Sequence, residues 1–162
     1  MNVFDDAWDE TPYPTPPGWE QRTKALLPSG QTLGMRLYEL FPWQTQVLYH
    51  FHHGNEEAVV VLSGTPTVRT PEGERALAAG DVVFFPHGPE GAHQLYNEGD
   101  KPARYLIAAS HVSPEVVEYP DSGKLLALSR SGPLWTMHRR EDAVDYFDGE
   151  HPRADALQKP DI

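Results

Sequence analysis

Turn residues divide the middle of the chain, residues 31–110, into short segments, and this punctuation most limits the folds open to it. The segments are apolar runs or alternate between apolar and polar residues, a pattern typical of strands. The chain contains 13 glycines and 16 prolines among 162 residues, which disfavours long helices. No segment between turns is long enough for the crossover helix that parallel strands require. We therefore predict an all-β, antiparallel sandwich or barrel.

The expected elements follow from these segments and from the composition of the two ends. We expect strands at residues 32–40, 46–52, 57–63, 67–70, 74–77, 82–86, 93–97 and 103–109, a further strand at 116–119 and an apolar run at 125–128. Residues 1–30, which are rich in proline, are expected to form an extended N-terminal arm, residues 31–128 the barrel, and residues 129–162 a C-terminal extension of the same domain. A shared helical face of Ala143, Val144 and Phe147 predicts a short helix over residues 140–147.

Charge and cysteine content exclude several classes of function. The chain has 13 Lys and Arg against 24 Asp and Glu, a formal net charge of −11, so we expect neither nucleic acid nor a membrane as partner. It has no cysteine, which excludes disulfides, thiolate metal sites and cysteine nucleophiles. The acidic N-terminus lacks the features of a signal peptide, and the longest apolar run, residues 58–62, is far shorter than a span of roughly 20 residues. We expect a soluble, cytoplasmic protein.

A histidine cluster is the most informative local feature of the sequence. His50, His52 and His53 are followed at once by a turn-forming Gly-Asn pair and then by Glu57. On a strand His50 and His52 would share a face with Cα atoms about 6.6 to 6.8 Å apart, and a turn at residues 53–56 would return Glu57 beside them. A surface or hydrogen-bonded histidine pair would look the same in isolation, so the carboxylate is what favours a metal site.

The donor atoms of this cluster suit a divalent transition metal. Two imidazoles and one carboxylate form the facial arrangement that non-haem iron and related sites use, and His93 offers a fourth ligand if its strand pairs nearby. Such ligands suit Fe, Mn, Ni, Co, Cu or Zn, so the sequence leaves the identity of the metal open. A six-coordinate ion with four protein ligands keeps open positions, which indicates chemistry or anion binding.

At this point the sequence resembles the cupin superfamily through both of its motifs. The first motif reads Gly, five residues, His-x-His, three or four residues, Glu, six residues, Gly, and it is matched here by His50, His52, Glu57 and Gly64. Its opening glycine is replaced by Gln44. The second motif reads Gly, five residues, Pro-x-Gly, two residues, His, three residues, Asn, and its fixed letters are Gly80, Pro86, Gly88, His93 and Asn97. Four residues, 89–92, stand where two are usual, so this loop is enlarged.

The resemblance covers residues 34–110, about half of the chain. It implies a double-stranded β-helix, which is a small antiparallel barrel or jelly roll, with a divalent metal held inside it by His50, His52, Glu57 and His93. It also implies a homodimer, which is common in the superfamily. The tail, around residues 119–124 and 142–150, is similar to that of stand-alone bacterial single-domain cupins, a group with no assigned reaction.

We therefore expect a metal-binding protein, and two classes of function remain open. The first is a metal-dependent enzyme of the oxygenase, isomerase or lyase type that acts on a small polar organic substrate. The second is a non-catalytic cupin that binds a small molecule or a sugar at the same ion. Gln46, Tyr105 and Asn97 are candidate residues of the substrate pocket.

Overall fold

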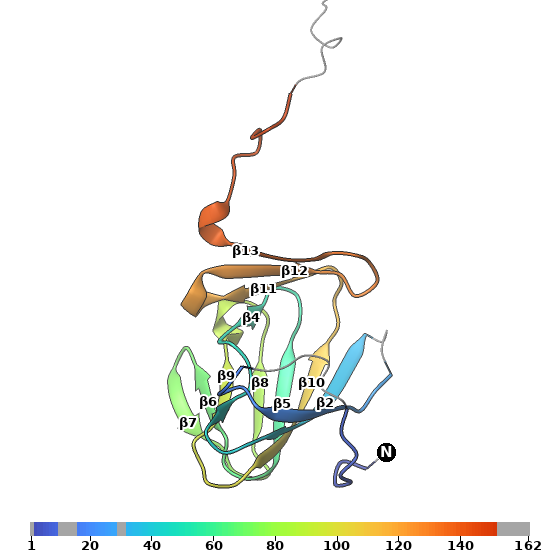
Figure 1. The fold of residues 1–162 in the computed structure, drawn as a ribbon, viewed down its shortest axis with the longest axis vertical. Coiled ribbons are helices and arrows are strands. Elements are labelled where there is room, and N and C mark those ends of the chain that lie inside the picture. The colour runs from blue at the N-terminus through green and yellow to red at the C-terminus, as the bar shows by residue number, and fades with distance from the viewer. Residues whose placement is uncertain (1, 10–15, 29–31, 152–162) are drawn as a thin grey trace, which may run out of the picture.

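The computed structural model describes residues 2–9, 16–28 and 32–151, and its strands form three antiparallel sheets (Figure 1). The largest sheet has five strands in the order β1 (Gln21–Ala25), β2 (Leu33–Leu40), β10 (Ala103–Ser110), β5 (Glu57–Ser63) and β8 (Val82–Phe85). A second sheet has the order β3 (Gln44–Thr45), β9 (Gln94–Asn97), β6 (Thr67–Thr70) and β7 (Gly73–Ala76). The predicted all-β, antiparallel class is confirmed.

The first two sheets enclose one apolar core. Its buried members come from both sheets and from the turns between them: Leu40, Val59, Val61, Val68, Leu77, Phe85, Leu95, Tyr105 and Ile107. Strand β10 shows how the sequence produces this core, because Ala103, Tyr105 and Ile107 are buried while the residues between them are only partly buried. Alternate side chains of a strand point to opposite faces, so period-two patterning places one row in the core.

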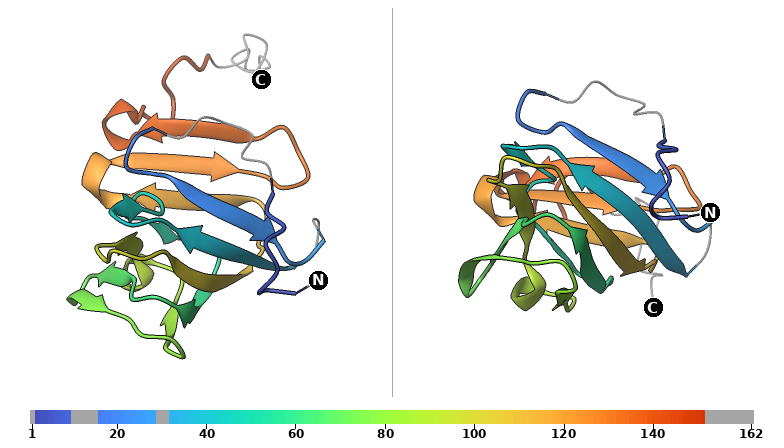
Figure 2. Two further views of the ribbon diagram at one scale, coloured as in Figure 1. Left: turned by 60° about the horizontal axis from the view of Figure 1, so that its bottom comes forward. Right: turned by 90° about the horizontal axis from the view of Figure 1, so that it is seen from below.

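A third sheet lies across one end of the barrel. Its order is β13 (Trp135–Arg139), β12 (Lys124–Leu128), β11 (Glu115–Tyr119) and β4 (Phe51–His52). Figure 1 shows these C-terminal strands in orange above the barrel, and Figure 2 shows them from two further directions. Strand β4 belongs to the histidine segment, so its pairing with β11 ties the C-terminal region to the predicted site.

Several elements differ from the sequence prediction. The expected strand at residues 46–52 is wrong in its extent, because the chain crosses there from one sheet to another and only Gln44–Thr45 and Phe51–His52 are strands. Two further strands were not foreseen: β1, which lies inside the expected arm and pairs with β2, and β13 in the C-terminal extension. Residues 1, 10–15, 29 and 30 of that arm lie outside the described residues.

The predicted helix over residues 140–147 is wrong. A single 3-10 turn, η3 (Arg140–Asp142), stands there, and Ala143 is already extended. The apolar face that predicted the helix has no surface to pack on, since the side chains of Val144 and Phe147 are exposed and the chain leads away from the barrel (Figure 1). A helix this short forms only with such packing. Among the described residues no helix is long and apolar enough to cross a bilayer.

Candidate functional site

Three of the predicted ligands form a compact cluster at the end of the barrel. The ligand atoms of His50, His52 and Glu57 all lie within 4.8 Å of one another. His52 belongs to β4, and Glu57 is the first residue of β5. The turn between them is held by Asn55, whose buried side chain accepts a hydrogen bond from the amide of Val112 at 2.6 Å. The predicted reversal of the chain after His52 therefore brings the carboxylate back to the histidines.

His93, the fourth predicted ligand, lies beside this cluster. Its Nε2 atom is 3.1 Å from Oε2 of Glu57, and the centroids of the His93 and His50 rings are 4.7 Å apart. Two backbone hydrogen bonds join residues 50 and 93, with N···O distances of 3.1 and 2.8 Å. The structure thus brings together all four residues that the sequence predicts as metal ligands.

The enlarged loop before His93 folds into a compact 3-10 turn, η1 (Pro89–Gly91). A glycine is required at position 91, because a Cβ atom there would lie 1.7 Å from the carbonyl oxygen of Pro86. Phe85 stacks on the His93 ring with centroids 3.8 Å apart. The extra residues are absorbed by this turn, so the imidazole remains at the cluster.

The orientation of two rings is set by backbone carbonyl groups. Nδ1 of His50 is 2.8 Å from the carbonyl oxygen of Leu48, and Nδ1 of His93 is 2.9 Å from that of Gly91. A neutral imidazole has one N–H, and if it donates to the carbonyl its Nε2 atom carries a lone pair. In that tautomer His93 directs a lone pair at the Glu57 carboxylate, so two acceptors face each other and only a cation or a proton between them satisfies both.

Burial keeps His50 and His52 neutral. The pKa of His50 is lowered to about 4, mainly by burial and in addition by the nearby His93 and His52. Burial also lowers the pKa of His52, although the charges of Glu57 and Glu115 oppose this. Burial acts to raise the pKa of Glu57, but the interactions with His93, His52 and His50 outweigh it and leave this pKa below its ordinary value. At neutral pH His50 and His52 are therefore unprotonated while Glu57 is a carboxylate, which is the state in which such groups bind metal ions.

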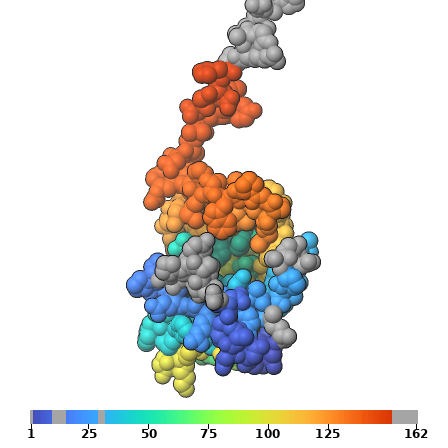
Figure 3. Space-filling model, turned by 45° about the vertical axis from the view of Figure 1, so that its right-hand side comes forward, coloured from blue at the N-terminus to red at the C-terminus, as the bar shows by residue number. Residues whose placement is uncertain are grey.

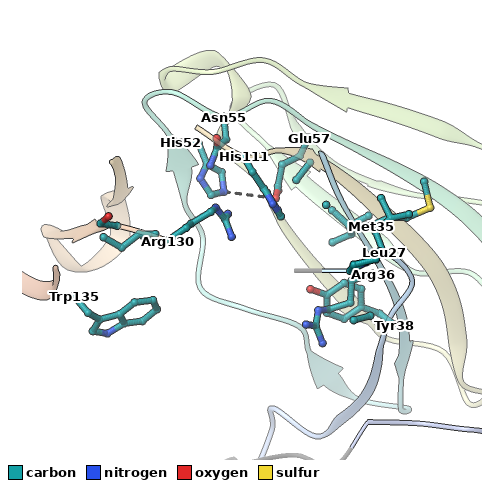
Figure 4. Close-up of a pocket in the computed structure, with 17 residues that line it drawn as sticks. Leu27, Met35, Arg36, Tyr38, His52, Asn55, Glu57, His111, Arg130 and Trp135 are labelled. Carbon is teal, nitrogen blue, oxygen red and sulfur yellow. Dashed lines mark ion pairs between the residues drawn. The ribbon is translucent and has the colours of Figure 1, made fainter. Parts of the chain in front are cut away.

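A cavity of about 490 Å³ opens beside the cluster. His52 and Glu57 lie at its inner end, and its walls come from the strands β1 and β2 on one side and from the β12–β13 connection on the other (Figure 4). In the space-filling view the hollow lies between the orange C-terminal sheet and the blue N-terminal strands (Figure 3). The cluster is thus reachable by a small molecule.

Four cavity residues were missed by the sequence analysis: Tyr38, His111, Arg130 and Trp135. Tyr38 belongs to β2, which sequence patterning treats as an ordinary strand, His111 directly follows β10, and Arg130 and Trp135 belong to the C-terminal extension. No motif marks any of them, because their role depends on sheets meeting in space. Glu115, which lies behind His52, did leave a signal: it continues the inward row of Val117 and Tyr119 on β11.

The residues predicted for a substrate pocket lie elsewhere. Gln46, Tyr105 and Asn97 are all buried, and none of them lines the cavity. Tyr105 belongs to the core and stacks on Tyr38 with ring centroids 5.5 Å apart. The side chain of Gln46 also reaches Tyr38, through a hydrogen bond. These two residues therefore support the cavity wall from behind.

Asn97 holds the turn that precedes β10. Its side-chain amide donates to the carbonyl groups of Leu40 and Lys101 at 3.1 and 2.8 Å, and its oxygen accepts from the amide of Gly99 at 3.0 Å. All of its polar atoms are used within the fold, so none is directed at a ligand.

Comparisons with known proteins agree with this geometry. A family model described as "Cupin domain" matches residues 37–109. The structure of a putative sugar phosphate isomerase from Acidithiobacillus ferrooxidans is 30% identical, with a TM-score of 0.70 over 80% of this chain and 82% of that chain. A sugar phosphate isomerase of a cupin superfamily, from Silicibacter pomeroyi, is 27% identical, with a TM-score of 0.68 over 83% of this chain and 82% of that one.

A more distant structure shares the fold alone. It is a predicted oxalate decarboxylase from Thermotoga maritima, 21% identical, with a TM-score of 0.52 over 57% of this chain and 81% of that chain. No curated protein sequence matches the chain.

Proposed function

The chain belongs to the cupin superfamily, and from this premise we propose that it is a divalent-metal-dependent enzyme whose substrate is a small organic anion. His50, His52, Glu57 and His93 would hold the ion. When bound, a divalent metal supplies a Lewis acid that polarises an oxygen atom of the substrate. The cavity beside the cluster would admit that substrate.

The observation that carries the metal proposal is the meeting of acceptor atoms at the cluster. His50 and His93 have carbonyl oxygens at Nδ1, so as neutral rings that donate to these oxygens they have unprotonated Nε2 atoms. The Glu57 carboxylate lies among the imidazoles, with oxygens 3.1 Å from His93 Nε2 and 3.7 Å from His52 Nε2. Buried acceptors without donors are costly, and a divalent cation satisfies all of them at once. The donor set of imidazole and carboxylate fits transition metals.

The charge of the cavity supports an anionic substrate. Although the chain has a net charge of −11, Glu57 is the one acidic residue among the described residues that line the cavity. Arg36 and Arg130 line the same cavity, and Arg36 is balanced by Asp9 at 3.4 Å. Within the described part of the chain Arg130 forms no ion pair, and Figure 4 shows its guanidinium directed toward His52. A carboxylate or phosphate on the substrate would find its counter-charge there.

Isomerisation is the reaction type that we favour. Two structures of similar sequence are described as sugar phosphate isomerases, and this chain covers most of each. Moving a carbonyl along a carbon chain needs groups that take and return a proton. His111 and Tyr38 line the cavity near Glu57. Burial raises the pKa of Tyr38 to about 12, so this residue stays protonated and acts as a hydrogen-bond donor.

A non-catalytic binding protein is the second candidate, and the scarcity of bases in the cavity favours it. Among the described lining residues the side chains of Glu57 and His52 belong to the cluster, and His111 is the other one of a type that commonly serves as a general base. A site of this kind could retain a sugar or organic acid at the ion without transforming it.

The experiment is metal analysis of tag-free protein followed by a turnover screen with aldose and ketose phosphates. We expect bound transition metal at one ion per chain, and interconversion of at least one sugar phosphate pair that is abolished by a chelator and restored by metal. Ligand-dependent thermal stabilisation without turnover would favour the binding protein. Absence of metal binding would overturn the proposal.

A further inference from the structure

His52 differs from the other histidines of the site, His50 and His93, in the surroundings of its Nδ1 atom. The Nδ1 atoms of His50 and His93 lie at hydrogen-bond distance from backbone carbonyl oxygens, whereas Nδ1 of His52 is buried and has no hydrogen-bond partner. The nearest acidic group to it is Glu115, whose Oε1 atom lies 3.9 Å away. At the opposite edge of the ring, Nε2 faces Oε1 of Glu57 at 3.7 Å. The imidazole thus stands between two carboxylates.

Glu115 is an unusual acidic residue for this chain. Its side chain is 1% exposed, and it begins β11, a strand that lies outside the matched family segment, residues 37–109. Oε1 accepts hydrogen bonds from the backbone amides of His53 and Gly54, both at 3.1 Å. Oε2 is buried without any partner. The neighbouring side chains of Glu115 and His52 therefore each hold one buried polar atom without a hydrogen-bond partner, Oε2 and Nδ1.

We propose that Glu115 is a positioning residue that accepts a hydrogen bond from Nδ1–H of His52. This contact would fix the His52 tautomer, leave the lone pair on Nε2 and make that nitrogen more basic. The two groups are about 1 Å too far apart for a normal hydrogen bond, so a small rotation of the imidazole toward β11 completes it. The inference rests on the proposed metal centre, since it assigns Nε2 as the atom that faces the ion.

A purely structural role does not explain the charge of Glu115. Capping the two amides needs one acceptor oxygen, which a neutral amide also provides, yet burying a carboxylate costs far more than burying an amide. Replacement of Glu115 by Gln keeps the size and the cap while removing the charge. Glu118 offers a matched control on the same strand, because it pairs with a histidine outside the cluster, His53, at 3.2 Å.

The test measures metal affinity and tautomer separately in the full chain. In the metal-free protein, ¹⁵N–¹H NMR of the imidazoles should show His52 as the Nδ1–H tautomer, with a mixed tautomer in Glu115→Gln. Titration with Zn²⁺ should give about 10- to 100-fold weaker binding in Glu115→Gln. Glu118→Gln should match the unmodified protein in both measurements.

Two outcomes would overturn the inference: an Nε2–H tautomer of His52 in the unmodified protein, or unchanged Zn²⁺ affinity and tautomer in Glu115→Gln. The tautomer of His52 is measured in the unmodified protein, so this result tests the inference even if Glu115→Gln does not fold. If the unmodified protein binds no Zn²⁺ while His52 is still the Nδ1–H tautomer, the metal proposal fails and the contact between Glu115 and His52 stands.

Discussion

The barrel segment and the C-terminal sheet contribute to the candidate site in different ways. Residues 37–109, which match the cupin model, supply the four proposed ligands, all within 44 positions of one another. The strands β11–β13 supply Glu115, which lies behind His52, and the connection between β12 and β13 supplies Arg130, which lines the cavity. In the proposed site the first region would bind the ion, and the second would supply the groups that orient one ligand and contact the substrate. We therefore expect substrate specificity to depend on the C-terminal sheet, which lies outside the segment that matches the cupin model.

The largest effect should come from removing a ligand of the barrel segment. His52→Ala should weaken Zn²⁺ binding by more than about 100-fold, beyond the loss typical of an outer-shell residue, and should abolish turnover. His53→Ala is the control, because this neighbouring side chain is 48% exposed and outside the cluster. If isothermal titration gives equal metal affinity for the two variants, His52 is not a metal ligand and the role assigned to the barrel segment is contradicted.

Acid sensitivity should follow the histidines of the barrel. The pKa of His50 is about 4 in the folded chain and 6.5 as its ordinary value, so the unfolded chain binds more protons between these pH values. The free energy of unfolding of the metal-free protein should therefore fall as pH drops from about 6.5 to 4, by about 3 kcal/mol from this residue. The lowered pKa of Glu57 adds a loss of the same sign at lower pH.

Urea denaturation across this pH range checks the expectation. His50→Gln should show a shallower dependence on pH, because the group that titrates is gone. A pH dependence that is the same in His50→Gln and in the unmodified protein would place the acid sensitivity outside the cluster.

A smaller effect is expected at the rim of the cavity. Arg130→Gln should weaken the binding of inorganic phosphate to the metal-loaded protein by about 10-fold, as expected for one lost charged hydrogen bond, and leave the metal affinity unchanged. Arg139→Gln is the matched control, since Arg139 ends β13, the strand that follows the connection holding Arg130, and does not line this cavity. If both variants bind phosphate equally well, the C-terminal sheet does not select the substrate.

The two regions also differ in how far sequence reasoning reaches. His50, His52 and Glu57 could be predicted because strand periodicity and one turn fix their geometry over a few residues, and His93 followed from the second motif. Alternation along β11 indicates that Glu115 points inward, but neither its place behind His52 nor the position of Arg130 could be predicted, because both depend on β11 and β12 packing against distant strands. The same limit applies to Asn97, which was predicted to lie in the substrate pocket but whose side chain closes a turn.

The helix expected over residues 140–147 failed for a related reason. Periodicity identifies an apolar face, but a face stabilises a helix only where another surface covers it. Strand β13 was missed because its exposed residues, such as Trp135 and Met137, do not alternate with buried ones. Backbone pairing with β12 forms this strand, and such pairing leaves little trace in the sequence.

The most direct test of the central claim is anomalous diffraction from crystals of the protein loaded with Zn²⁺. We expect one strong peak roughly 2.0 to 2.2 Å from the Nε2 atoms of His50, His52 and His93 and from a carboxylate oxygen of Glu57. No peak at this position, or a peak held by other side chains, would contradict it.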